Sequence, residues 1–124
     1  MDYLHVALPI SKVLEYRRLC MDLFQRRGIL TWEWSIWGRP EFFSFLIAER
    51  DDAGEPSSLN MAETVDEVLK LAQGMGGTME YCHGVGLKLS HLVDSDLGTG
   101  ALASRRIKTV LDPNDILNPG KLFA

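Results

Sequence analysis

Residues 29–49 read ILTWEWSIWGRPEFFSFLIAE, and this stretch decides the fold. Its first nine residues are rich in β-branched and aromatic side chains, which favour a strand. A Gly38-Arg39-Pro40 turn follows, and residues 41–49 return as a second strand. The stretch therefore predicts an antiparallel hairpin.

Strand alternation divides the first strand of this hairpin into two faces. One face is expected to hold Trp32, Trp34 and Ile36, and the other to hold Thr31, Glu33, Ser35 and Trp37. Both faces of the returning strand are partly apolar, which is typical of a strand that is covered on both sides or that lines a pocket. Sheet core and an aromatic pocket are thus the two interpretations of these side chains.

Helical periodicity appears on both sides of the hairpin. Residues 11–27 predict an amphipathic helix that follows a short strand and ends at a glycine, with Cys20 on its apolar face. A second helix begins near Asn60, which is expected to form a capping box with Glu63. Two helices that each follow a strand predict an α+β arrangement.

The C-terminal third of the sequence is more interrupted. Residues 87–93 predict a short helix, residues 94–100 a linker, and residues 101–111 a last helix that Asp112-Pro113 ends. The remaining tail is too rich in proline, glycine and asparagine for regular structure, but its apolar residues predict that it docks on another surface. We expect a ferredoxin-like antiparallel sheet of three strands with helices on one face, followed by these C-terminal helices and the docking tail.

Composition limits the class of protein. The 124 residues fit one domain, and 46% hydrophobic with 24% charged residues is ordinary for a globular protein. A net charge of −4 without a basic run argues against nucleic acid as a partner, and the apolar runs are too short to span a bilayer. The start of the chain predicts no signal peptide. Cys20 and Cys82 lie in unrelated contexts, which favours reduced thiols and the cytoplasm.

The chemistry of the chain is concentrated in residues 76–88, GGTMEYCHGVGLK. Cys82 and His83 are adjacent, and the glycines around them permit positive φ angles and the close approach of a flat ligand. Histidine is the side chain best suited to moving a proton near neutral pH. On composition alone, a turn histidine that merely bonds a backbone carbonyl remains the plainer interpretation.

Two segments together resemble a known family: residues 76–88 and residues 106–123, RIKTVLDPNDILNPGKLF. In this order they are similar to the C-terminal cap domain of FAD-linked oxidases of the vanillyl-alcohol-oxidase type. That family includes glycolate oxidase FAD subunits, D-lactate and D-2-hydroxyglutarate dehydrogenases, and alkyldihydroxyacetonephosphate synthase. The resemblance implies that residues 1–124 are the C-terminal part of such a cap domain, whose FAD is held mainly by a domain outside this sequence.

The resemblance also implies roles for particular residues. His83 corresponds to the family histidine near the flavin, which takes the substrate's hydroxyl proton while hydride passes to the flavin. Tyr81 beside it is either a proton donor or a core residue. Gly84 and Gly86 are expected to let the cofactor approach. In the tail, Asn118 and Lys121 match the motif that folds against the flavin domain, and Lys121 meets either an anionic group or water.

The same comparison predicts no metal. Hydroxy-acid dehydrogenases of this family carry a glutamate before the histidine and two histidines in the preceding hairpin. Here Cys82 replaces the glutamate, and the hairpin contains no histidine. Cys82 and His83 alone supply half of a zinc site. In the alkyldihydroxyacetonephosphate synthase pattern, the catalytic tyrosine falls at Phe42, which has no hydroxyl group.

The function expected from these observations is that of a substrate-binding cap-domain fragment. Its enzyme would oxidise a 2-hydroxy acid or an alcohol by hydride transfer to FAD, and the isolated chain would be inactive. The expected partners are a small-molecule substrate, the FAD-binding domain and a second copy of the chain. The alternative is a non-catalytic ferredoxin-like module that binds a ligand or dimerises through an exposed sheet edge.

Overall fold

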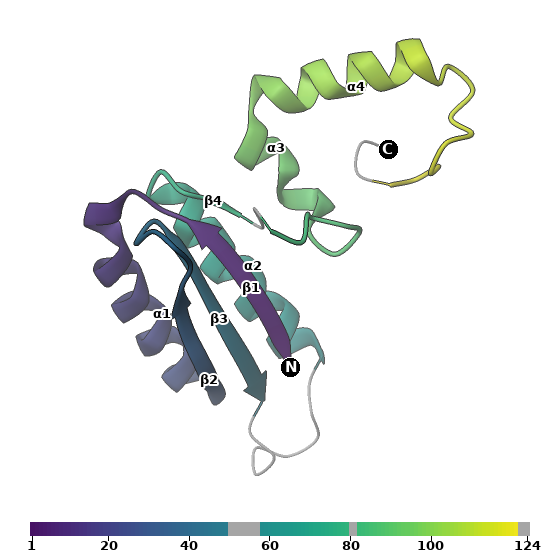
Figure 1. Ribbon diagram of the computed structural model, residues 1–124. Coiled ribbons are helices and arrows are strands. Elements are labelled where there is room, and N and C mark those ends of the chain that lie inside the picture. The colour runs from purple at the N-terminus through teal and green to yellow at the C-terminus, as the bar shows by residue number, and fades with distance from the viewer. Residues whose placement is uncertain (50–57, 80–81, 122–124) are drawn as a thin grey trace. The chain divides into compact units, whose positions relative to one another are not determined.

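The computed structural model describes residues 1–49, 58–79 and 82–121 (Figure 1). The chain divides into two compact units, Met1–His83 and Gly84–Ala124. Each unit is described below by itself.

The first unit is a four-stranded antiparallel sheet with two α-helices. The strands occur in the order β2-β3-β1-β4, which is the order of a ferredoxin-like βαββαβ fold. The predicted α+β class is therefore confirmed, but the sheet has one strand more than the sequence predicted. The elements in chain order are β1 (Asp2–Ala7), η1 (Ile10–Lys12), α1 (Val13–Arg27), β2 (Ile29–Ile36), β3 (Phe42–Glu49), α2 (Ser58–Gly74) and β4 (Thr78–Met79).

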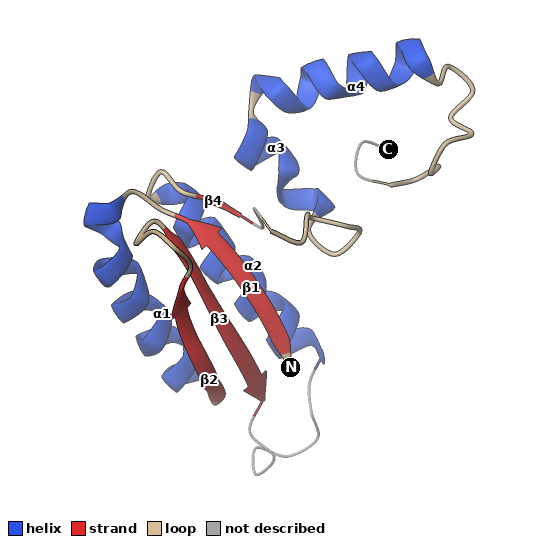
Figure 2. Cartoon of the chain, viewed as in Figure 1, coloured by secondary structure: helices blue, strands red, loops and turns tan. Residues whose placement is uncertain are grey.

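Both α-helices of this unit lie against the same face of the sheet (Figure 2). The core forms between them and the alternate strand residues that point toward them. From the strands it contains Leu4, Val6, Phe43, Phe45 and Ile47, and from the helices Val13, Tyr16, Cys20, Leu23, Phe24, Val65, Val68, Leu69 and Ala72. The Tyr16 hydroxyl donates a hydrogen bond to the Val68 carbonyl at 2.9 Å, so this core also joins α1 to α2 through a satisfied polar group.

Helix α1 agrees with the sequence-based prediction. It ends at Gly28, which adopts the left-handed conformation at φ 66° and bonds back to the last turn. Cys20 is fully buried on the apolar face, as expected. Burial raises the pKa of its thiol to about 12, so Cys20 is an inert core residue rather than a nucleophile.

The hairpin of β2 and β3 contains an irregularity that the sequence did not predict. Thr31 pairs with Ile47, and Glu33 pairs with the adjacent Leu46, so Trp32 is an extra residue at a β-bulge. The bulge moves Thr31 onto the face opposite Glu33 and leaves Trp32 68% exposed. The predicted grouping is therefore wrong for Thr31 and Trp32.

Three aromatic residues of the hairpin, Trp34, Phe43 and Phe45, form core rather than a pocket. Phe43 and Phe45 are buried on the helix side, and Trp34 stacks on Phe43 with ring centroids 5.3 Å apart. The Arg17 guanidinium lies over the Trp34 ring, 5.1 Å from its centroid, in a cation–π contact. The alternative in which these phenylalanines line a substrate pocket is therefore wrong, and the interpretation as sheet core is correct for Trp34.

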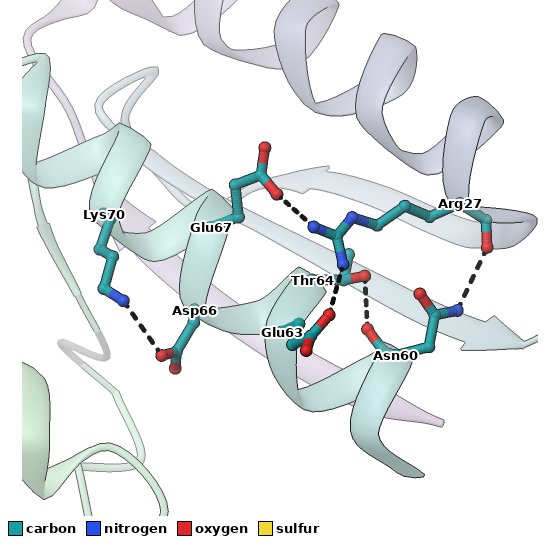
Figure 3. A network of polar contacts seen from close by, with 7 residues as sticks. All are labelled: Arg27, Asn60, Glu63, Thr64, Asp66, Glu67 and Lys70. Carbon is teal, nitrogen blue, oxygen red and sulfur yellow. Dashed lines mark hydrogen bonds and ion pairs between the residues drawn. The ribbon is translucent and has the colours of Figure 1, made fainter. Parts of the chain in front are cut away.

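The start of α2 also differs from the prediction. Asn60 is not a cap: it lies inside the helix, and its side-chain amide donates to the Arg27 carbonyl at 3.2 Å. Glu63 does not close a capping box but pairs with Arg27, whose guanidinium also bonds Glu67 at 2.7 Å (Figure 3). The Arg27 end of α1 is thus fastened to the first turns of α2, and this long-range contact replaces the local cap.

The turn between α2 and β4 depends on one glycine. A Cβ atom at Gly77 would lie 2.6 Å from the Ala7 carbonyl oxygen and 2.9 Å from that of Ala72. Only a glycine lets the chain pass this close to β1. Beyond it, Thr78 and Met79 pair with Ala7 and Val6. Part of the segment predicted to be a loop is therefore a strand, and it carries the chain along β1 toward His83.

The second unit contains η2 (Ser90–Leu92), α3 (Val93–Leu97) and α4 (Thr99–Leu111). The last helix is confirmed, but most of the predicted linker is helical. The tail is organised by Asp112, whose carboxylate accepts the backbone N–H groups of Ile116 and Leu117 and pairs with Lys108. Asp112 therefore folds the tail back toward α4 as well as ending the helix.

No helix within the described residues is long and apolar enough to cross a membrane. This agrees with the expectation from the lengths of the apolar runs.

Candidate functional site

His83 and Cys82 lie just beyond β4, at the end of the first unit, and both side chains are exposed. The His83 imidazole meets the His5 imidazole edge to face, with ring centroids 4.5 Å apart. It also lies 6.0 Å from the ring of Tyr3. The predicted histidine is thus placed against two aromatic side chains of β1.

His5 is the central residue of this cluster. Its side chain is only 3% exposed, and its ring lies 4.6 Å from Tyr3 and 6.4 Å from Trp37. Burial and the nearby His83 lower the pKa of His5, while Glu33 opposes that shift. His5 is therefore held mainly in its neutral form at pH 7.

We call six residues on the side of the sheet away from α1 and α2 the polar face: Tyr3, His5, Glu33, Ser35 and Ser44 from the strands, and Trp37 just after β2. They are linked by hydrogen bonds. The Tyr3 and Ser35 hydroxyls donate to the same Glu33 oxygen, at 3.1 and 2.5 Å, and the Trp37 indole N–H donates to the Ser44 hydroxyl at 2.6 Å. This network fixes the aromatic rings around His5, because each polar end has a partner.

The structure describes four of the other five predicted site residues. Tyr81 lies outside the described residues, so its role stays a prediction. Gly84 and Gly86 have φ angles of 72° and 54°, which satisfies the expectation that glycine is needed there. In the second unit Asn118 adopts a left-handed conformation at φ 49°, and Lys121 is exposed. Their predicted contacts with a cofactor remain predictions.

Sequence analysis missed most of the polar face. The sequence predicts a short strand from Tyr3 to Leu8, but it gave neither Tyr3 nor His5 a functional role. Alternation along residues 3–8 carried the signal: Leu4, Val6 and Leu8 share the apolar face, which leaves Tyr3 and His5 on the other. A buried strand face with a tyrosine and a histidine needs polar partners, and that requirement points to a site.

The prediction that no metal binds relied on a count of two donor side chains. The structure adds a third, because His5, Cys82 and His83 each offer one donor atom and these atoms lie within 4.8 Å of one another. His5 comes from β1, far from the other two in sequence. The ligand count used in that argument was therefore too low.

The arrangement suits proton transfer more than nucleophilic attack. Imidazole is the commonest proton-transfer group in enzyme sites, and the His83 side chain is exposed. The surrounding rings of His5, Tyr3 and Trp37 offer flat surfaces and a few oriented polar groups. Such a combination is typical of a site that binds a small, partly planar molecule.

The fold and this site define the class of protein: a ferredoxin-like domain that presents histidine from the end of its sheet. The family model described as "FAD linked oxidases, C-terminal domain" matches residues 2–122. The chain belongs to this family, as the two sequence segments led us to expect.

Several characterised proteins are similar to the chain. The mitochondrial D-lactate dehydrogenase (cytochrome) of Kluyveromyces lactis is 32% identical over 95% of the chain, which corresponds to 20% of that protein. Glycolate oxidase subunit GlcD of Bacillus subtilis is 41% identical over 47% of the chain and 13% of its own length. D-2-hydroxyglutarate dehydrogenase of Xanthomonas citri pv. viticola is 39% identical over 56% of the chain and 16% of its own length. The chain thus spans a fifth or less of the length of these relatives.

Proposed function

We propose that the chain is the C-terminal part of a cap domain in an FAD-dependent oxidoreductase. The enzyme oxidises a 2-hydroxy acid or an alcohol, and this chain supplies the substrate-facing groups. The observation that carries the proposal is the contact of His83 with His5, whose rings lie 4.5 Å apart beside the hydrogen-bonded polar face. Relatives named for D-lactate, glycolate and D-2-hydroxyglutarate support the substrate class.

The residues of this chain suit contact with a bound flavin, whereas most of the cofactor's binding contacts belong to another domain. The polar face offers aromatic rings, and His83 beside it offers an exposed imidazole. The backbone at Gly84 and Gly86 is open to close approach, since even an added Cβ at either would meet nothing within 4 Å. In our proposal these two glycines, with Asn118 and Lys121, contact the cofactor or its domain. FAD, when bound, accepts a hydride from the substrate carbon.

In this proposal, the chemical role of the chain's own residues is to accept the hydroxyl proton of the substrate. Oxidation of a 2-hydroxy acid to a 2-oxo acid removes a hydride from the carbon and a proton from the hydroxyl group. His83 takes that proton on an imidazole nitrogen, which leaves both electrons of the O–H bond to form the carbonyl. Tyr81 is proposed to assist as a donor to the substrate. His5, buried against His83, keeps the His83 ring in position.

A substrate panel tests the function. The chain, within its full-length FAD enzyme, is mixed anaerobically with D-lactate, glycolate, D-2-hydroxyglutarate and simple alcohols, and bleaching of the flavin absorption is recorded. We expect reduction by at least one 2-hydroxy acid, with a second-order dependence on its concentration at low concentration. Failure of every 2-hydroxy acid and alcohol to reduce bound FAD would remove the proposal.

A second function has a specific observation in its favour, namely the exposed sheet edge at β2. Trp32 on that edge strand is 68% exposed, and such a strand can pair with another copy of the chain. Homodimerisation therefore stays a prediction, and with it the non-catalytic binding module. Sedimentation of the chain over a concentration series tests it: a dimer that Trp32→Lys disrupts supports the edge contact, and a monomer at all concentrations contradicts it.

The cytoplasmic location also stays a prediction. Cys20 and Cys82 are both free thiols, which agrees with a reducing compartment. The Kluyveromyces lactis relative, however, carries "mitochondrial" in its name. Fractionation of cells that express the tagged full-length protein decides between the two.

A further inference from the structure

We propose that the polar face selects the substrate: it favours a 2-hydroxy acid whose side chain is a flat, uncharged aromatic ring, and it rejects one that carries a second carboxylate. Trp37 contacts the ring, and Glu33 repels the second carboxylate. The inference rests on the proposed function, because it names the substrate class of the site at His83.

Trp37 presents an exposed ring that the structure already holds in place. The residue is 52% exposed, yet its indole N–H donates to the hydroxyl of buried Ser44 at 2.6 Å. Its backbone N–H donates to the Phe42 carbonyl at 2.9 Å. A side chain that is fixed before the ligand arrives loses little freedom on binding. Trp37 therefore offers a preformed surface to a second aromatic ring.

This surface is close to the proton acceptor. The His5 ring adjoins both side chains, with its centroid 4.5 Å from that of His83 and 6.4 Å from that of Trp37. Aromatic rings in contact have centroids roughly 4.5–7 Å apart, so these rings form a continuous aromatic surface. A substrate whose hydroxyl group meets His83 can thus reach Trp37 with a side chain of one ring.

Glu33 sets the charge of the same surface. Among the six described residues of the polar face it is the one carboxylate, and none of the six is lysine or arginine. Its oxygen accepts the Tyr3 and Ser35 hydroxyls at 3.1 and 2.5 Å, which fixes the carboxylate in place. Its charge also acts on His5, whose pKa it tends to raise.

A fixed negative charge discriminates between substrates. It turns the carboxylate of a 2-hydroxy acid away from the polar face and leaves an uncharged side chain on that face. A substrate with carboxylates at both ends cannot turn both away, and like charges brought together weaken binding. Glu33 should therefore disfavour dicarboxylic 2-hydroxy acids.

A matched pair of substrates tests the aromatic contact, since D-3-phenyllactate is D-lactate with a phenyl ring on its methyl carbon. We expect kcat/KM of the full-length FAD enzyme to be about tenfold higher for D-3-phenyllactate. Trp37→Ala should remove most of this preference, and Trp37→Phe, which keeps a ring, should retain most of it. Trp32→Ala is the matched control: Trp32 is 68% exposed in the same strand region but lies outside the polar face, and its loss should leave the ratio unchanged.

A second pair tests the charge: D-2-hydroxyglutarate and the derivative in which its distal carboxylate is an amide. The wild-type enzyme should prefer the amide by about tenfold or more. Glu33→Gln keeps an oxygen that accepts the Tyr3 and Ser35 hydroxyls but removes the charge, so the ratio should fall toward one. Because each ratio compares two substrates in the same enzyme, an effect of the variant on proton acceptance cancels.

Separate outcomes distinguish this inference from the proposed function. Equal kcat/KM for D-lactate and D-3-phenyllactate, or a phenyl preference that Trp37→Ala leaves intact, would overturn the aromatic contact. A preference for the amide that persists in Glu33→Gln would overturn the charge selection. Binding is measured apart from turnover with 3-phenylpropanoate and propanoate, which lack the hydroxyl group, by calorimetry. Tighter binding of 3-phenylpropanoate that Trp37→Ala abolishes, in an enzyme that oxidises no 2-hydroxy acid, contradicts only the proposed function.

Discussion

His5 on β1 and His83 beyond β4 bring their imidazole rings edge to face, with centroids 4.5 Å apart, although 78 positions separate them in the sequence. The antiparallel pairing of β4 with β1 produces this contact, because it carries the chain alongside Val6 and Ala7. The buried ring is fixed by the sheet and the exposed ring is available to a ligand. A long-range backbone pairing thus creates the site.

The close passage at Gly77 predicts a large effect of a single methyl group. Gly77→Ala places a Cβ 2.6 Å from the Ala7 carbonyl oxygen, so β1 or the turn must shift. We expect the free energy of unfolding to fall by about 1–3 kcal/mol or more. Urea denaturation measures it. Gly74→Ala is the control, because its added Cβ meets nothing within 4 Å, and equal loss in the two variants would contradict the account.

The lowered pKa of His5 predicts a stability change with pH. Its folded-state pKa lies below the ordinary value of 6.5, so below about pH 6.5 the unfolded chain binds a proton that the folded chain does not. The wild-type free energy of unfolding should therefore fall as the pH is lowered from about 6.5 toward the folded-state pKa. Above about pH 6.5, His5 should contribute no pH dependence. Denaturation at pH 7.5 and 5.5 measures the slope. His5→Gln should flatten it in this window, and a slope equal to that of the wild type would show that His5 is not the cause.

The two cysteines should differ in reactivity. Cys82 is exposed, whereas burial raises the pKa of Cys20 to about 12. We expect a small thiol reagent at pH 8 to modify one cysteine in the native chain and both after unfolding, as counted by mass spectrometry. Cys82→Ser should abolish the native reaction. Rapid modification of native Cys20 would contradict the packing of α1.

The tail should depend on Asp112. Its carboxylate accepts the amide protons of Ile116 and Leu117, and its hydrogen bond with Lys108 lowers the pKa of Asp112. Asp112→Ala removes both acceptors, so those two amides should exchange with solvent much faster while α1 is unaffected. Hydrogen exchange read by NMR measures this. Asp115→Ala is the control, since Asp115 pairs with the same Lys108 at 3.0 Å whereas the two amides donate to Asp112.

The sequence predicted the elements that local rules govern. Helix α1 follows from its apolar spacing and from Gly28, and the chemistry of Cys82 and His83 stood out because of the adjacent glycines. These local rules do not predict which residues far apart in the sequence contact one another. Asparagine is a common N-cap residue, which is why the sequence predicted a cap at Asn60. In the structure its side-chain amide instead donates to the Arg27 carbonyl of α1. The bulge at Trp32 depends on the register with β3, and the role of His5 depends on β4 reaching β1.

The rate of flavin reduction in a His83 variant tests the central claim most directly. The full-length enzyme and its His83→Ala variant, each confirmed by absorption to hold FAD, are mixed anaerobically with the best 2-hydroxy acid, and His91→Ala serves as the matched control. We predict that His83→Ala reduces the rate by about 10²–10⁴-fold, the usual contribution of a general base, while His91→Ala does not change it. Equal rates in the wild-type enzyme and the His83→Ala variant would contradict the assignment of the substrate's proton to His83.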